Sequence, residues 1–317
     1  MSVLVFADSS EGKFKKTAFE VVSYGKKVAE ELGTNLVALT INGGDASELY
    51  AFGAEKVLEV KNDLSTFNAK AYASIINQAA EAQSANVVVI DSSVDGLYVA
   101  PMVAVAMNAG YASNVVALPS STAPFTVKRK AFSNKAFSNT IVSTDKKVIG
   151  VAKNSYGAHE NAVAGSAETF SANVPEMGVT SESVDKATGV ITIADADIVV
   201  SAGRGLKGPE NWGMVEELAS VLGAATACSK PVSDLGWRPH SEHVGQTGKP
   251  VASNLYIAIG ISGAIQHLAG INASKVKVVI NTDPEAPFFK AADYGIVGDA
   301  FEFVPQLVEK LKAFKQA

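Results

Sequence analysis

Residue types that favour anion binding are concentrated in the last third of the chain, between residues 254 and 281. A run of bulky apolar residues ends there at Gly260, and residues 262–264 are expected to open a helix. Backbone N–H groups at a helix start lack carbonyl partners, and the helix dipole adds partial positive charge. No Asp or Glu occurs from 255 to 281. This pattern predicts a phosphate-binding turn, although an ordinary strand-to-helix turn would use the same residues.

A second candidate is the segment SAGRGLKG at 201–208, where Arg204 stands between glycines directly after an apolar strand. Ligands of open α/β sheets dock at the carboxyl ends of the strands. The planar, permanently charged guanidinium of Arg204 would suit a phosphate group. A solvated loop arginine is the alternative interpretation.

The third candidate is the segment HVGQTGKP at 243–250, which offers two glycines, an amide, a hydroxyl and a lysine in succession. Such a loop can surround a polar heteroaromatic ring and exchange hydrogen bonds with it through backbone and side chains. The same composition is common in surface turns.

Other chemical groups are weaker candidates. His240, Glu242 and His243 lie within four residues, but no second cluster completes a zinc shell. Asp283 and Glu285, beside two prolines, indicate a rigid turn more than an acid/base pair. The single cysteine, Cys228, cannot form an internal disulfide, and we expect a small buried hydrophobic residue there.

The elements that position these residues alternate between strand and helix patterns. The first half reads as strand VLVFAD, helix 17–32, strand NLVALTI, helix 68–82 and strand NVVVID, which predicts an open, mostly parallel α/β sheet. From about 123 to 153 the pattern changes to period-two alternation, which predicts an added antiparallel hairpin.

A polar, turn-rich stretch at 178–195 suggests a domain boundary near residue 190. We therefore expect an N-terminal α/β domain at 1–190 and a second domain at 191–317. The second domain reads as strand 197–201, helix 211–222, strand 255–260 followed by a helix, strand 275–281 and a closing helix 304–314. The fold class is α/β with two domains, and the C-terminal domain is doubly wound.

Composition limits the partners. The chain has 317 residues with 47% hydrophobic and 19% charged residues and a net charge of −5, so it lacks the basic footprint of a nucleic-acid-binding protein. The apolar stretch 255–271 contains three glycines, a serine, a glutamine and a histidine, so we expect no membrane insertion there. The N terminus lacks the features of a secretory signal, and we expect a cytoplasmic protein, or an organellar one after processing.

Three long motifs then occur in one order: VGQTGK at 244–249, LYIAIGISGAIQHLAG at 255–270 and INTDPEAPFFKAADYGIVGD at 280–299. Together they resemble the signature of the electron transfer flavoprotein alpha subunit, the large subunit of that family. The resemblance is close from about residue 198 to the C terminus. In the first domain it lies in the order of strands and helices. It implies that the segment from Arg204 to Asp299 holds a flavin adenine dinucleotide (FAD).

The resemblance also implies contacts for individual residues. In the family, the first motif contacts the isoalloxazine, with the threonine near flavin N5, and the second motif lies along the flavin and its phosphates, with its histidine at the pyrimidine end. On this sequence those positions are Val244, Gly245, Gln246, Thr247, Ser262, Gly263, Ala264, Ile265, Gln266 and His267.

Weaker correspondences place Arg204 at the phosphates, Ser229 against the cofactor, and Asn281 and Asp299 toward the ribose and adenine. The family commonly has an arginine stacked on the flavin after that serine, whereas this chain has Lys230. Lysine keeps the charge but loses the planar, stacking group. We therefore expect the one-electron-reduced flavin to be less stabilised than in the arginine form.

The implied function is that of an electron carrier and not of an enzyme. It would accept electrons from flavin dehydrogenases, such as the acyl-CoA dehydrogenases of fatty acid beta-oxidation, and pass them to a quinone oxidoreductase. It would act as a heterodimer with the beta subunit of the electron transfer flavoprotein. Two alternatives are a subunit of an electron-bifurcating complex that oxidises NADH and a non-redox nucleotide-binding module.

Overall fold

A computed structural model describes residues 1–62, 64, 66–132, 134–179, 181–184, 191–194 and 196–316. The chain divides into two compact units, and the division falls at 185/186. The predicted boundary at residue 190 lies outside the described residues and stays a prediction.

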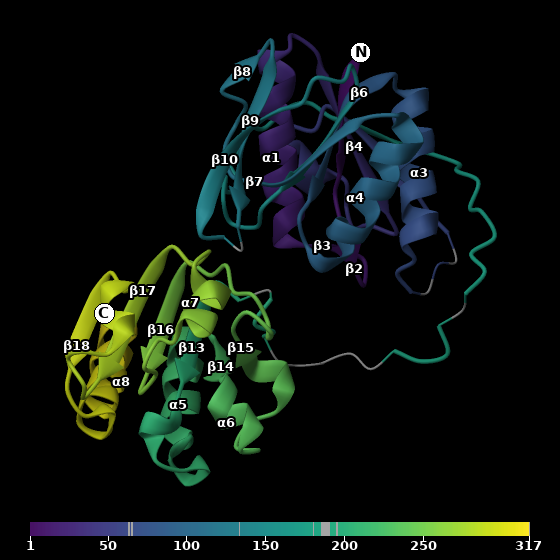
Figure 1. Ribbon diagram of the computed structural model, residues 1–317. Coiled ribbons are helices and arrows are strands. Elements are labelled where there is room, and N and C mark those ends of the chain that lie inside the picture. The colour runs from purple at the N-terminus through teal and green to yellow at the C-terminus, as the bar shows by residue number, and fades with distance from the viewer. Residues whose placement is uncertain are drawn as a thin grey trace. The chain divides into compact units, whose positions relative to one another are not determined.

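The first unit is built on a ten-stranded sheet with the order β10-β9-β7-β11-β6-β1-β4-β5-β12, and β8 pairs with β9 (Figure 1). Strands β7, β11, β6, β1, β4, β5 and β12 pair in parallel, whereas β8, β9 and β10 are antiparallel. The strands are β1 (Ser2–Phe6), β4 (Asn35–Ile41), β5 (Lys56–Val60), β6 (Ala85–Asp91), β7 (Gly110–Val115), β8 (Ser121–Thr122), β9 (Phe125–Ala131), β10 (Ala136–Ile141), β11 (Lys147–Val151) and β12 (Ser166–Thr169); β2 (Ser9–Ser10) and β3 (Lys13–Phe14) form a separate small hairpin.

Helices cover both faces of this sheet. They are α1 (Lys16–Glu31), α2 (Ser47–Tyr50), α3 (Ala69–Ala82) and α4 (Val94–Met107). Along β1 the side chains alternate, so that Val3 and Val5 pack with α1 whereas Leu4 and Phe6 pack with α3 and α4. The predicted open sheet and added hairpin are confirmed by this arrangement.

The second unit has a six-stranded, all-parallel sheet with the order β15-β14-β13-β16-β17-β18. From the central β13 the chain adds two strands on one side and then crosses to β16 and adds the rest on the other. This order is typical of doubly wound nucleotide-binding domains, whose ligands lie where the direction reverses. The strands are β13 (Ile198–Ala202), β14 (Ala225–Ser229), β15 (His243–Val244), β16 (Leu255–Ile259), β17 (Val276–Asn281) and β18 (Tyr294–Val297).

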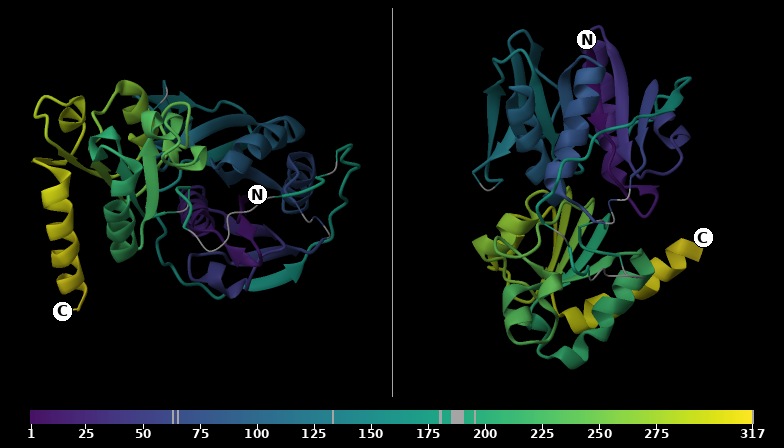
Figure 2. Two further views of the ribbon diagram at one scale, coloured as in Figure 1. Left: turned by 90° about the horizontal axis from the view of Figure 1, so that it is seen from below. Right: turned by 90° about the vertical axis from the view of Figure 1, so that its right-hand side faces the viewer.

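Two groups of helices cover this sheet. One face packs on α5 and α8, which lie side by side (Figure 2). An ion pair of 2.7 Å between Lys312 and Glu217 joins these two helices. The other face packs on residues around α7 and η4. The helices are α5 (Gly213–Leu222), α6 (Lys230–Asp234), α7 (Ile265–Ile271) and α8 (Ala300–Gln316), with short 3-10 turns η1 (Arg204–Leu206), η2 (Pro209–Asn211), η3 (His240–Glu242) and η4 (Pro287–Lys290).

Two helix starts differ from the sequence prediction by three or more residues. Helix α7 begins at Ile265, after the predicted 262–264, because Gly263 has a φ of +84° that a right-handed helix does not accept. Helix α8 begins at Ala300, four residues before the predicted start, because the Asp299 carboxylate accepts a hydrogen bond from the Phe301 N–H at 3.0 Å. In the described part of the chain, no helix combines the length and apolar character that a membrane span needs.

Candidate functional site

A cavity of about 590 Å³ opens at the carboxyl ends of the second unit's strands. Its wall takes residues from the loops that follow β13, β14, β15, β16 and β17, so it lies across the point where the strand order reverses. This volume falls within the range of small-molecule and cofactor sites. The cavity is lined by Arg204, Gly205, Ser229, Lys230, Pro231, Asp234, His243, Val244, Gly245, Gln246, Thr247, Gly260, Ile261, Ser262, Ala264, Gln266, His267, Asn281 and Asp283.

Two glycine loops meet at the centre of this site. The Gly205 N–H donates to the Gly260 carbonyl at 3.1 Å, and a Cβ on Gly260 would lie 2.8 Å from the Gly205 Cα. Gly260 also has a φ of +60°, which L side chains rarely adopt. Only glycine therefore lets the loops after β13 and β16 approach this closely, and the floor of the cavity is backbone.

The loop from Gly260 to Ala264 leads into α7. The first backbone hydrogen bond of α7 runs from the His267 N–H to the Ala264 carbonyl at 2.9 Å. N–H groups that precede the first helical bond have no carbonyl partner in the helix, and they suit an anion. Ser262 is exposed on the cavity wall beside them. The segment can thus receive a phosphate, although the helix is shorter than predicted.

The loop after β15 is held against α7 by backbone contacts. The Gln246 N–H donates to the Gln266 carbonyl at 2.7 Å, and the Lys249 N–H donates to the His243 carbonyl at 2.8 Å. These bonds fix the backbone, while the side chains of Gln246 and Thr247 stay exposed at the cavity. Both side chains are therefore free to exchange hydrogen bonds with a bound ring.

Two cations and two carboxylates line the wall. Arg204 and Lys230 are exposed, and neither forms an ion pair in the described part of the chain. Burial, followed by the positive charge of Lys230, lowers the pKa of the neighbouring His243. Asp234 and Asp283 are the carboxylates on the wall. Two exposed cations at a backbone-lined turn fit a pyrophosphate.

His267 is a buried titratable residue on the wall, with 7% of its surface exposed, the same fraction as His243. Its Nε2 is hydrogen-bonded to the Tyr256 hydroxyl at 2.9 Å, and its Nδ1 has no hydrogen-bond partner among the described residues. Burial lowers the pKa of His267 to about 4; the nearby Val244 backbone opposes this without meeting hydrogen-bond geometry at Nδ1. The imidazole is therefore neutral at pH 7, with one nitrogen left for a ligand.

The cavity gathers all the predicted site residues except three. Gly263 faces the Phe288 backbone, where a Cβ would come within 2.6 Å, and Ile265 is exposed outside the lining. Asp299 also lies outside it, because its carboxylate caps α8 and lies 4.0 Å from the Lys207 Nζ. The cofactor contacts of these residues, like those of the wall residues, stay predictions.

Sequence reasoning did not place several wall residues at the site. They are Gly205, Pro231, Asp234, His243, Gly260, Ile261 and Asp283. Gly205 and Gly260 lie within segments already singled out, and their spacing after apolar runs was the available signal. Asp234 gave no signal, because only the fold brings the end of α6 to the cavity.

The residues of the candidate zinc cluster and the single cysteine make other contacts or are buried. Glu242 accepts two hydrogen bonds from Arg238, at 2.8 and 2.6 Å, and His240 Nδ1 is hydrogen-bonded to Ser233 at 2.9 Å. Among the described residues, no group of three or more His, Cys, Asp or Glu could hold a metal ion. Burial raises the pKa of Cys228 to about 12, so its thiol is unreactive near neutral pH.

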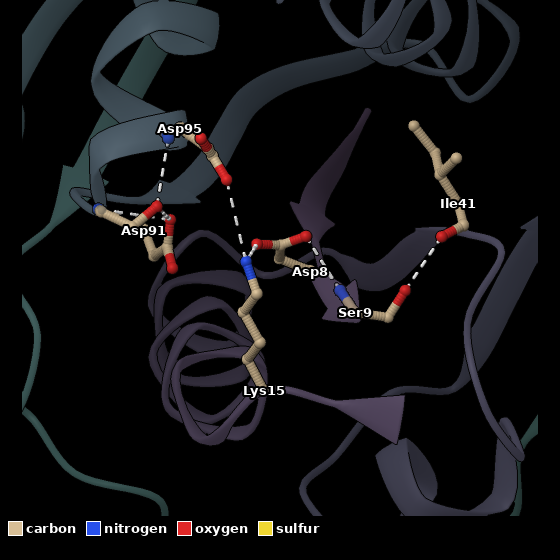
Figure 3. A network of polar contacts seen from close by, with 8 residues as sticks. Asp8, Ser9, Lys15, Ile41, Asp91 and Asp95 are labelled. Atoms are coloured by element: carbon tan, nitrogen blue, oxygen red, sulfur yellow. Dashed lines mark hydrogen bonds and ion pairs between the residues drawn. The ribbon is translucent and has the colours of Figure 1, made fainter. Parts of the chain in front are cut away.

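The first unit also reverses its strand order, between β1 and β6. The polar residues that meet there are mostly carboxylates. Lys15 contacts Asp8 at 2.5 Å and lies 3.8 Å from Asp95, and the buried Asp91 lies beside them (Figure 3). Burial, the largest cause, raises the pKa of Asp8 although Lys15 opposes it. Three carboxylates around one ammonium would repel phosphate. The cavity of the second unit is therefore the better nucleotide site.

Comparison with known proteins gives the same assignment. A model of the "Electron transfer flavoprotein domain" matches residues 3–180, and a model of the "Electron transfer flavoprotein FAD-binding domain" matches residues 192–272. The protein named electron transfer flavoprotein subunit alpha from Thermoanaerobacterium thermosaccharolyticum is 35% identical over 327 residues, covering 99% of this chain and 98% of that protein. The chain belongs to the electron transfer flavoprotein alpha subunit family.

Two other relatives match over similar lengths. The alpha subunit of Bacillus subtilis is 34% identical over 322 residues, covering 98% of this chain and 97% of the relative. The acryloyl-CoA reductase electron transfer subunit beta of Anaerotignum propionicum is 29% identical over 354 residues, covering 99% of this chain and 96% of the relative.

As a member of this family the chain is an electron transfer subunit, and its cofactor is FAD. The residues of the cavity also fit this cofactor chemically. The range matched as FAD-binding carries the glycine floor and the exposed cations Arg204 and Lys230. It also holds the buried Nδ1 of His267, which has no hydrogen-bond partner among the residues that the structure describes.

Proposed function

We propose that this chain is the FAD-carrying subunit of a cytoplasmic electron carrier. It would accept electrons from flavin dehydrogenases such as acyl-CoA dehydrogenases, as in fatty acid beta-oxidation, and deliver them to a quinone oxidoreductase. The observation that carries the proposal is the cavity at the strand reversal of the second unit. Its wall combines two cations, which form no ion pair with any described residue, with exposed hydrogen-bonding side chains. Sequence identity over nearly the full length of alpha subunits supports it.

FAD, when bound, supplies the one-electron oxidation and reduction chemistry. Arg204 would hold its phosphates together with the N–H groups before α7, since a planar guanidinium and free N–H groups both match phosphate oxygens. Lys230 and Ser229 would hold the cofactor from the end of β14. Asn281, at the end of β17, would face its ribose.

The loop after β15 would orient the ring. Gln246 and Thr247 are exposed on a backbone that hydrogen bonds hold in place, so their amide and hydroxyl can meet ring heteroatoms at low entropic cost. The Thr247 hydroxyl would donate or accept a hydrogen bond at the part of the ring that takes up and releases protons together with electrons. Neutral His267 would donate to a ring acceptor as negative charge develops, as preorganised donors do in other redox and acyl-transfer sites.

We further propose that the carrier works as a heterodimer with the smaller beta subunit. The cavity wall leaves Gln246, Thr247 and Ser262 exposed, which is the arrangement expected of a site that a second chain covers. The relatives named as alpha subunits support this pairing.

Co-expression of the chain with its beta subunit tests the proposal. We expect a yellow heterodimer whose flavin absorbance is bleached when an acyl-CoA dehydrogenase and its acyl-CoA substrate are added anaerobically, and restored by a quinone oxidoreductase with quinone. The same mixture without the dehydrogenase is the control. A colourless chain, or a complex that binds an adenine nucleotide without flavin, would contradict the proposal.

A second candidate is a subunit of an electron-bifurcating complex that oxidises NADH. The relative named as an electron transfer subunit of acryloyl-CoA reductase favours it, because that name links the chain type to a reductase complex. The flavin count separates the two functions. One FAD per heterodimer supports the simple carrier, whereas a second FAD in the beta subunit and bleaching by NADH support bifurcation.

A further inference from the structure

A buried tyrosine lies directly behind the histidine of the cavity wall. Tyr256, on β16, is fully buried, and its hydroxyl is 2.9 Å from the His267 Nε2. The tyrosine ring is stacked on Phe288 with an interplanar angle of 8°, and the His267 ring packs on the same phenylalanine with centroids 6.1 Å apart. Packing and the hydrogen bond together hold the imidazole in one orientation.

The direction of this hydrogen bond follows from the acidity of the two groups. Burial raises the pKa of Tyr256, which the nearby Ser201 side chain opposes, and it lowers the pKa of His267, so both side chains are neutral at pH 7. Between a neutral phenol and a neutral imidazole, the phenol O–H is the stronger donor and the bare ring nitrogen the stronger acceptor. With the hydroxyl as donor to Nε2, the imidazole proton lies on Nδ1.

The Val244 backbone lies near the His267 ring, but it makes no hydrogen bond of acceptable geometry to the remaining nitrogen. The Nδ1 of His267 is buried and lacks a hydrogen-bond partner among the described residues, while the ring belongs to the cavity wall. A buried N–H without an acceptor destabilises the protein, and a ligand acceptor removes that cost. We propose that Tyr256 is a positioning residue: its hydroxyl fixes the His267 proton on Nδ1 and makes that nitrogen a hydrogen-bond donor to the bound flavin. This inference rests on the proposed function.

The first test reads the proton directly. In heterodimer labelled with ¹⁵N-histidine and loaded with FAD, two-bond ¹H–¹⁵N correlations distinguish the two neutral tautomers. The chain has four histidines, so the His267→Gln variant identifies the His267 signals. We expect the Nδ1–H tautomer in the wild type and a shift of the population toward Nε2–H in Tyr256→Phe. An Nε2–H tautomer in the wild type, or an unchanged tautomer in Tyr256→Phe, overturns the proposal.

The second test measures flavin affinity in matched variants. Asn places its amide N–H₂ near the Nδ1 position and Gln places it near Nε2. We therefore expect His267→Asn to bind FAD within about threefold of the wild type and His267→Gln to bind about tenfold more weakly, as the loss of one hydrogen bond predicts. Tyr256→Phe is expected to weaken binding about threefold or more, while Tyr294→Phe on the exposed strand β18 leaves it unchanged.

Tighter binding by the Gln than by the Asn variant would overturn the assignment of the donor. If Tyr256→Phe loses the flavin altogether, the tautomer is read in flavin-free wild type and variant, where the same shift is expected. A wild-type heterodimer without flavin would instead overturn the proposed function, and the tautomer could still be determined.

Discussion

Lys230 occupies the position at which related sequences are expected to carry a stacking arginine, and the structure places it on the cavity wall without an ion pair among the described residues. A guanidinium stacks on an aromatic ring, whereas an ammonium acts as a hydrated point charge. The difference in such a contact is about 0.5–1 kcal/mol, which corresponds to about 20–40 mV for one electron.

Lys230→Arg is therefore expected to raise the potential of the first one-electron step by about 20–40 mV, since one-electron reduction adds negative charge beside the stacked cation. Spectroelectrochemical titration of the loaded heterodimer gives both one-electron potentials. Lys275→Arg, on an exposed residue outside the cavity, is the control. Potentials that do not change in Lys230→Arg would contradict this role.

His267 links the site to the stability of the flavin-free protein. Its folded pKa of about 4 lies below the ordinary value of 6.5, so the unfolded chain binds the proton more readily. The contribution of the neutral His267 to the free energy of unfolding is fully present above pH 6.5. It falls as the pH drops and is lost near pH 4. Between pH 7 and pH 5 this group alone is expected to cost about 2 kcal/mol.

Urea unfolding of flavin-free protein at the two pH values measures this term. The wild type should lose about 2 kcal/mol more than His267→Gln between pH 7 and pH 5, because glutamine does not titrate. Equal losses in both proteins would show that the His267 ring is not held in its neutral form.

At the scale of elements, the site depends on the contact between the loops after β13 and β16. In Gly260→Ala, the new Cβ would lie 2.8 Å from the Gly205 Cα on a backbone with a φ of +60°. The left-handed conformation alone costs about 1–2 kcal/mol for alanine, and the contact adds to it. We expect at least a tenfold loss of FAD affinity and a lower unfolding temperature.

The matched control is Gly213→Ala at the first residue of α5. A Cβ there meets no atom within 4 Å, and the change is expected to stabilise the fold by about 0.4–1 kcal/mol. Isothermal titration with FAD and thermal unfolding report both effects. If the two variants bind FAD equally well, the glycine contact does not shape the site.

Strongly patterned elements could be predicted from the sequence, and others could not. Helix α3 follows its predicted start closely, since Asn68 caps it by accepting from the Ala71 N–H at 3.1 Å. Helix α4 was missed because it is apolar on all sides, so that no polar face contrasts with a buried one, and because Pro101 lies inside it. The strand run ending at Gly260 was found, but the helix start beyond it depends on Gly263.

The same limit applies to the site. Arg204, Thr247 and His267 stand in local motifs that the sequence shows directly. Tyr256 does not, because within its strand it is one more apolar residue, and only the packing of α7 on β16 brings its hydroxyl to the histidine. A residue that acts through a neighbour brought close only by the fold has no characteristic sequence spacing from which its role could be predicted.

At the scale of the whole molecule, the wall of the cavity comes entirely from the second unit. Binding stabilises the part of a protein that contacts the ligand, by about 2.7 kcal/mol at a ligand concentration a hundred times the dissociation constant. In hydrogen–deuterium exchange of the heterodimer, FAD should therefore protect peptides from β13, β16 and α7 most strongly.

Peptides from the first unit, such as β4 and α3, provide the internal reference. Their exchange is expected to change far less than that of the site peptides when FAD is added. Equal protection in both units would contradict a site confined to the second one.

Ser262 is the position at which binding of the FAD phosphates by the loop before α7 can be measured. This residue is exposed on the wall, so Ser262→Glu and Ser262→Gln introduce side chains of similar size with minor effects on the fold. The flavin content of each purified heterodimer is measured after acid release. We predict about one FAD per heterodimer for the wild type, most of it retained in Ser262→Gln, and a nearly colourless Ser262→Glu, because a carboxylate there repels the pyrophosphate. Equal flavin content in the glutamate and glutamine variants would show that the FAD phosphates do not bind at this loop.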